Sequence, residues 1–294
     1  MNREKFTHIG ITKEDNITKI KKKPVRGFPI VSAAILFVVF VMCVFADLIA
    51  THDPAELNLM AFSLAPCREY IFGTDNLGRD VFSCLLYGGR ISLITGLLST
   101  AISTFIAMVY GTLSGLAPDF LDKILMRFAE ILLSIPSLLT VIFVQAVIGE
   151  ASVISISFVI GITSWFSMAK IIRTEVRRIR NSDFVLASKA LGGSFFHILI
   201  KHLAPNFIPS IMFMVVMNIR SAIASESALS FMGLGLPLEV VSLGSMLSLA
   251  QNALMSRQWW IIVVPGVYLV MILMSVTEFG NYLRKSANRK DSML

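Results

Sequence analysis

The most regular feature of the chain is a series of long windows that contain no charged side chain. Asp, Glu, Lys and Arg are all absent from 28–46, 91–118, 131–149, 151–169 and 258–277. Each window reaches the ~17–25 residues that an α-helix needs to cross about 30 Å of hydrocarbon. A sixth window, 207–232, is equally apolar but contains Arg220 and Glu226. We therefore predict an all-α integral membrane protein with six transmembrane helices.

These windows divide the chain into predicted regions. They are a basic cytoplasmic N-terminus at 1–27, a first transmembrane helix at 28–50, an extracellular segment at 51–90, a core of five transmembrane helices at 91–282 with a cytoplasmic loop at 171–206, and a cytoplasmic tail at 283–294. The core includes continuous helices at 125–149 and 151–170, which the short turn at Gly149 makes antiparallel neighbours. The first apolar run exceeds the 7–15 residues of a signal-peptide core, so we expect this helix to be retained.

Composition and charge agree with a membrane protein. The chain is 55% hydrophobic and only 15% charged, whereas soluble domains carry about 25% charged residues. Alternating the loops across six spans puts 21 Lys and Arg on the side of both termini and only Arg68, Arg79, Arg90 and Arg257 on the other. Because positive loops stay in the cytoplasm, both termini are predicted to be cytoplasmic. The basic residues flank helices without interleaved aromatics, which argues against nucleic-acid binding.

The loop at 171–206 carries helix signals of its own. Asn181, Ser182 and Asp183 can cap a first short helix, and apolar residues then recur at helical spacing, at Phe184, Val185, Ala187, Ala190 and Leu191. Gly192 and Gly193 end this helix, Ser194 can cap a second one at 195–203, and Pro205 ends that. Each helix has an apolar face that the loop cannot bury alone. This face is expected to be buried either against a protein partner or on the lipid surface.

Three separated motifs resemble one protein family. Residues 184–192, followed by 201–206, resemble the EAA loop of binding-protein-dependent ABC importer permeases. Residues 72–80 and 88–93 are similar to the segment before the second span in C-type permeases for dipeptides, oligopeptides and nickel. Residues 226–235, together with 244–247, are similar to the segment where the fifth span ends in the same family. The resemblance covers 28–286. The chain departs from the pattern at Leu186 and Ser188, which replace the Glu and an Ala of the EAA motif, and at Leu243, where Trp is frequent.

The resemblance implies a passive subunit of an ATP-driven importer in the bacterial inner membrane. Its partners would be a second homologous permease, two ATPase subunits that carry ATP and Mg, a periplasmic or extracellular solute-binding protein, and membrane lipid. No catalytic, cofactor or metal site is expected in this chain. The residues expected to couple to the ATPase are Asp183, Phe184, Ala187, Ala190, Leu191, Gly192, Gly193, His197, Lys201, His202 and Pro205.

Two charged pairs are further candidates. A charge at mid-depth costs about 2.5–3.5 kcal/mol on insertion scales, so Arg220 is predicted to line the translocation pathway. Glu226 lies nearer the outer end and is assigned to the same pathway, with a role in gating or packing. The alternative is that the two residues pair with each other. Arg79 and Asp80 either dock the binding protein or form an ion pair that pins the extracellular segment.

Other function classes fit the sequence less well. An intramembrane enzyme needs a nucleophile and base or a metal triad at one depth, but His8, His52, His197 and His202 all lie outside the predicted spans. A transporter working alone would not need the helical loop, and no broken helices recur as inverted repeats. Short peptides and nickel or a metal chelate both remain possible substrates. The absence of His, Cys and paired carboxylates at ligand spacing within the spans argues against coordination of a bare metal. A chelated metal would resemble a peptide to such a pathway and stays open, and peptide is favoured.

Overall fold

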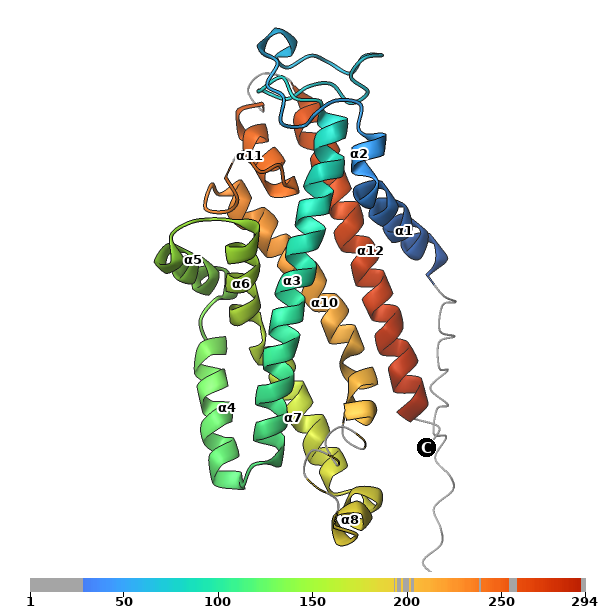
Figure 1. The fold of residues 1–294 in the computed structure, drawn as a ribbon, viewed down its shortest axis with the longest axis vertical. Helices are drawn as coiled ribbons and strands as arrows, with labels where there is room; N and C mark the ends of the chain where they lie inside the picture. Colours follow the sequence, from blue (N-terminus) through green and yellow to red (C-terminus); the bar gives the residue numbers. More distant parts are fainter. Residues whose placement is uncertain are drawn as a thin grey trace, which may run out of the picture.

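The described residues form a bundle of helices around one long central helix. The computed structural model describes residues 29–192, 194, 197, 201, 204–237, 239–253 and 258–291. The main helices of this part are α1 (Ile30–Val44), α2 (Ala46–Ile49), α3 (Val81–Leu116), α4 (Asp119–Leu133), α5 (Ser137–Ile148), α6 (Val153–Ser164), α7 (Phe166–Arg180), α8 (Asp183–Ala190), α10 (Ala204–Phe231), α11 (Leu243–Ala253) and α12 (Trp259–Asp291). Figure 1 shows α3 at the centre, with segment 51–80 at one end of the bundle and α8 at the other. We call these the outer end and the α8 end.

Several helices are long and apolar enough to cross a membrane. Three single helices qualify within the described residues, namely α3, the Ile211–Phe231 part of α10 and the Trp259–Ser286 part of α12. Two bent pairs, α4 with α5 and α6 with α7, raise the number to five if each pair is one span. The first predicted span appears as α1, a shorter apolar helix of 15 residues. The chain is therefore all-helical with three to five candidate spans in its described part.

Two predicted continuous helices are broken. The first, predicted at 125–149, bends by 89° between α4 and α5. Pro136 explains this break, because proline lacks an N–H and disfavours helical backbone in the residue before it. The second, predicted at 151–170, bends by 46° at Trp165. There the hydroxyls of Thr163 and Ser164 bond to carbonyls one turn back, a pattern that bends helices.

Two helices also extend beyond their predicted limits. The helix expected from 91 begins at Val81, because the Asp80 side chain accepts bonds from backbone N–H groups of its first turn. The helix expected to end at 170 continues to Arg180. This extension packs against the central helix, where a Cβ on Gly115 would come within 2.8 Å of Val176. Glycine on α3 thus allows α7 to approach closely.

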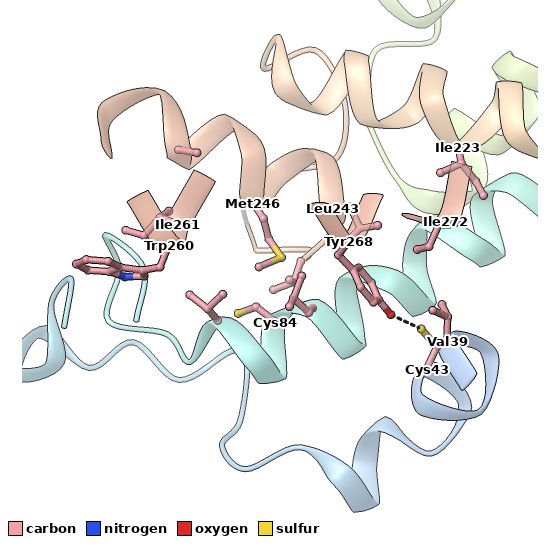
Figure 2. Packing of buried hydrophobic residues seen from close by; sticks show 14 of the residues in the cluster. Val39, Cys43, Cys84, Ile223, Leu243, Met246, Trp260, Ile261, Tyr268 and Ile272 are labelled. Atoms are coloured by element: carbon pink, nitrogen blue, oxygen red, sulfur yellow. Dashed lines mark hydrogen bonds between the residues drawn. The ribbon is translucent and has the colours of Figure 1, made fainter. Parts of the chain in front are cut away.

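The largest hydrophobic cluster lies toward the outer end and joins α1, α3, α11 and α12, and Ile223 of α10 is also buried in it. Cys84, Met246 and Tyr268 are buried in it, and the Cys43 sulfur lies 3.6 Å from the Tyr268 hydroxyl (Figure 2). Cys43, Cys67 and Cys84 are all free thiols. The cluster fixes the outer ends of four helices relative to one another.

Candidate functional site

A polar cavity of about 340 Å³ lies where the two broken helices meet α10. Its lining combines hydroxyls, an amide and one guanidinium with apolar side chains, from Leu133, Ser137, Thr163, Ser164, Phe166, Ser167, Met168, Met214, Met217, Asn218, Arg220 and Ser221. Non-helical backbone at membrane depth is tolerated where it borders a cavity. The breaks therefore open a polar site in the middle of an otherwise apolar bundle.

Arg220 supplies the only charge of this lining. It lies near the middle of Ile211–Phe231, and its side chain is exposed. Within the described part of the chain, its guanidinium has no ion pair and no hydrogen bond. The alternative pairing with Glu226 is not formed. The position agrees with the predicted pathway role, which stays a prediction.

Glu226 has the opposite environment and does not line the cavity. Its side chain is fully buried, and its carboxylate accepts hydrogen bonds from the hydroxyls of Ser92 on α3 at 2.9 Å and Ser230 on α10 at 2.9 Å. Ser92 in turn accepts a bond from the Leu243 N–H at 3.4 Å, and Ser230 one from the Leu236 N–H at 3.1 Å. The carboxylate therefore joins α3, α10 and the connection into α11. The prediction that Glu226 lines an open pathway differs from this structure, because bonding to hydroxyls keeps the carboxylate in the protein interior.

Arg79 and Asp80 are both buried at the outer end, at 3% and 1% exposure. The partner of Arg79 is Asp75, with Nε 2.8 Å from a carboxylate oxygen, and not Asp80 as predicted. Asp80 instead caps α3 by accepting the Ser83 N–H at 3.0 Å. Such burial leaves little of either side chain for a docking partner. Both residues therefore stabilise the conformation of the outer segment. This agrees with the alternative that an ion pair pins the segment, although the partner of Arg79 is a different residue.

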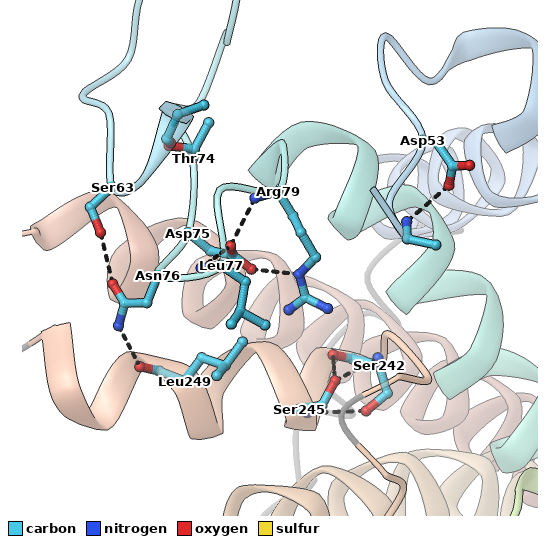
Figure 3. Close-up of polar contacts among 12 residues, drawn as sticks. Asp53, Ser63, Thr74, Asp75, Asn76, Leu77, Arg79, Ser242, Ser245 and Leu249 are labelled. Carbon is cyan, nitrogen blue, oxygen red and sulfur yellow. Dashed lines mark hydrogen bonds and ion pairs between the residues drawn. The ribbon is translucent and has the colours of Figure 1, made fainter. Parts of the chain in front are cut away.

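The same outer segment is fastened to the helices beneath it. Asn76 donates to the Leu249 carbonyl of α11 at 3.3 Å and accepts from Ser63 at 3.0 Å (Figure 3). The indole N–H of Trp260, at the start of α12, donates to the Thr74 carbonyl at 3.1 Å. These contacts make the segment a rigid cover on the outer ends of α11 and α12.

The first of the two helices predicted in the long loop is present as α8. It starts at Asp183 and buries Val185, at 1% exposure, in the cluster that includes α7. Other coupling candidates point outward, since Ala187, Ala190, Leu191, Gly192, His197 and Lys201 are exposed. Gly192 ends the helix as predicted, with a left-handed φ of +82°. Ser194 accepts the His197 N–H at 3.3 Å, as a cap of the next turn would. Gly193 and His202, and the side chains of Phe184 and Pro205, lie outside the described residues.

A charged network at the α8 end was not identified from the sequence. Asp122 of α4 is buried and accepts from Arg173 of α7 at 2.9 Å and from the Ser114 hydroxyl of α3 at 2.6 Å. Arg177 lies 3.1 Å from the same carboxylate. The sequence places these residues near predicted helix ends, but nothing in their spacing pairs them. The network ties α3, α4 and α7 together next to α8.

Residues 104–288 match the family described as the binding-protein-dependent transport system inner membrane component. The chain is 34% identical over 256 residues to the dipeptide transport system permease protein DppC of Bacillus subtilis, covering 87% of this chain and 80% of that protein. It is 32% identical over 261 residues to the probable D,D-dipeptide transport system permease protein DdpC of Escherichia coli, covering 88% and 87%.

A solved structure shares the fold. A chain of the MetNI methionine ABC transporter, in an inward-facing form, matches with a TM-score of 0.55 at 16% identity, covering 69% of this chain and 96% of that chain.

Proposed function

Because the chain belongs to the family of binding-protein-dependent transport system inner membrane components, we propose that it forms half of the translocation pathway of an ATP-driven importer of short peptides. As a member of this family it is a multi-pass inner-membrane protein. The observation that carries the peptide assignment is its likeness to dipeptide and oligopeptide permeases along most of its length. Arg220 and its cavity are then part of the pathway.

Nickel, or a chelated metal, is the alternative substrate. Within the described residues no group of three or more His, Cys, Asp or Glu could hold a metal ion, and the cavity lining contains none of these residue types. Bare nickel prefers imidazole or thiolate ligands, so these observations argue against bare nickel as the substrate.

Uptake of labelled dialanine and labelled nickel in a strain lacking this gene separates the two substrates. We expect the strain to lose dialanine uptake and to keep nickel uptake, and the intact gene should restore dialanine uptake to the wild-type level. Loss of nickel uptake with normal dialanine uptake would overturn the peptide assignment.

We propose that two ATPase subunits, carrying ATP and Mg, drive this chain and a second permease through α8. The support is a mechanical connection. The first residues of α7, Phe166 and Ser167, line the cavity, while its buried face shares a hydrophobic cluster with Val185 of α8. Movement of α8 would therefore turn α7 as a rigid lever at the cavity wall. A solute-binding protein would deliver the peptide at the outer end.

Gly192→Val tests the coupling through α8. A side chain in left-handed backbone costs about 1–2 kcal/mol, and we expect the strain to distort the end of α8. The amount of dialanine imported per ATP hydrolysed should fall in the reconstituted complex.

The matched control is Gly149→Val at the turn between α5 and α6. Gly149 has a φ of +87°, and at both glycines an added Cβ would meet no atom within 4 Å. Both variants therefore place a β-branched side chain on backbone of positive φ without a steric clash, one at the end of α8 and one far from it. Equal coupling ratios in the two variants would contradict the assignment of α8.

We also propose six spans with both termini in the cytoplasm, supported by the basic last turn of α7 at Arg177, Arg178 and Arg180. Protease-sensitive tags at either terminus should be protected in spheroplasts. Cleavage of a tag from outside would overturn this topology.

A further inference from the structure

We infer that the cavity beside Arg220 binds the C-terminal carboxylate of the transported peptide. This inference rests on the proposed function and assigns the chemistry that one part of the pathway recognises. It starts from the cost of placing Arg220 where it is. A guanidinium in the middle of a span is retained where water or an anion reaches it, and here it faces a cavity without any protein carboxylate.

The charge of the lining has one sign. Arg220 is its only ionisable side chain, and within the described residues its guanidinium makes no bond to the protein. Its planar fork of N–H donors therefore stays available, and that geometry fits a carboxylate through two parallel hydrogen bonds. A cationic ligand would meet repulsion and would find no counter-ion there.

Neighbouring hydroxyls add further donors. Ser137, Ser167 and Ser221 line the cavity with exposed side chains, and no described residue bonds to their hydroxyls. By contrast, the hydroxyls of Thr163 and Ser164 donate to carbonyls of their own helix. The lining thus contains two kinds of hydroxyl: those bonded to carbonyls of their own helix, and those available to a ligand.

The α5 helix contributes in the same direction. It begins at Ser137 after Pro136, and no side chain caps its first turn. The N-terminal turn of a helix presents N–H groups and partial positive charge. At the cavity this field has the same sign as the Arg220 guanidinium, so both favour an anion.

The carboxylate is the anion that a peptide always has. Short peptides differ in their side chains but share a backbone, an α-ammonium and an α-carboxylate. Of these shared groups the carboxylate alone carries a negative charge, so a fixed cation in the pathway can serve peptides of many sequences by binding the carboxylate end. The volume of about 340 Å³ is near the lower limit of ligand pockets, which suits one end of a peptide.

Protection of a cysteine from alkylation tests this site without the binding protein. The variant carries Ser221→Cys next to the intact Arg220, and Cys67→Ser removes the one exposed native thiol. The purified complex is treated with N-ethylmaleimide, which is uncharged, in the presence of dialanine or its C-terminal amide. We expect excess dialanine to slow alkylation about tenfold more than the amide does, the scale of one lost charged hydrogen-bonded pair.

Adding Arg220→Gln to the same variant should abolish the difference between dialanine and its amide, whereas Arg220→Lys should retain part of it. Arg127→Gln makes the same change of charge outside the cavity, at a side chain 78% exposed, and should leave the difference intact. Equal protection by the two probes, or none, would overturn the carboxylate assignment. Dialanine uptake by the parent complex reports separately on the proposed function, so a failure of the carboxylate assignment can be distinguished from a failure of peptide import.

Discussion

Two charged residues on one helix, six positions apart, have opposite surroundings. Glu226 is fully buried, and its carboxylate accepts bonds from serine hydroxyls of two helices. Arg220 is exposed to a cavity and makes no bond with the described part of the chain. Both would be costly in lipid alone. Hydrogen-bond donors of the protein offset the cost for Glu226, whereas Arg220 faces a cavity that water or a ligand can occupy.

The difference separates a charged residue that is bonded within the protein from one that is open to a ligand. A buried charge whose hydrogen bonds are complete has no capacity left for a substrate, and removing it leaves its donors unsatisfied. A charge that faces a cavity keeps its bonding capacity, so its removal changes binding more than folding. Hydropathy alone does not distinguish these cases, since both residues interrupt the same apolar window.

The largest effect on folding is expected from Glu226→Leu. Without the carboxylate, the buried hydroxyls of Ser92 and Ser230 lose their acceptor, and we expect a loss of about 3 kcal/mol in stability. Thermal unfolding of the purified complex in detergent would measure it. Glu239→Leu is the matched control, because Glu239 is exposed on the connection that follows α10. Similar melting temperatures for the Glu226→Leu and Glu239→Leu variants would contradict a stabilising role for the serine contacts.

A smaller loss is expected from Asp122→Asn at the α8 end. Asp122 is buried and meets Arg173 and Arg177, each 27% exposed. Losing one partner of a buried pair costs ~3–5 kcal/mol, but partly solvated arginines reduce this to about 2 kcal/mol. Asp119→Asn is the control, because Asp119 pairs with Arg177 at 78% exposure. Equal melting temperatures for these two variants would show that burial of Asp122 does not matter.

The smallest effect on folding is expected from Arg220→Met. No protein partner is lost, so the change in stability should stay within about 0.5 kcal/mol, as for surface substitutions outside special features. Dialanine uptake should nevertheless fall strongly at unchanged membrane abundance. If the melting temperature or the abundance falls together with uptake, Arg220 is a structural residue and the comparison with Glu226 fails.

The sequence by itself determined the parts of the protein that depend on local patterns. Charge-free windows indicated the apolar helices, because crossing lipid requires an unbroken apolar surface. The Asn181–Asp183 segment and Gly192 predicted where α8 begins and ends, because cap residues and left-handed backbone depend on local sequence. The family followed from motifs that lie in order along the chain.

Only the tertiary structure decided which charged groups meet. Arg79 has a carboxylate on either side in the sequence, at Asp75 and Asp80. The turn around Asp75 brings that carboxylate into an ion pair with Arg79, while Asp80 caps α3. Asp122 meets Arg173 across 51 positions, a distance over which no periodicity operates. Glu226 and Arg220 look alike in hydropathy, yet the packing of α3 surrounds one with hydroxyls, and the helix breaks open a cavity beside the other. Hydrogen bonds and ion pairs act over a few ångströms in space, so separations along the chain do not specify them.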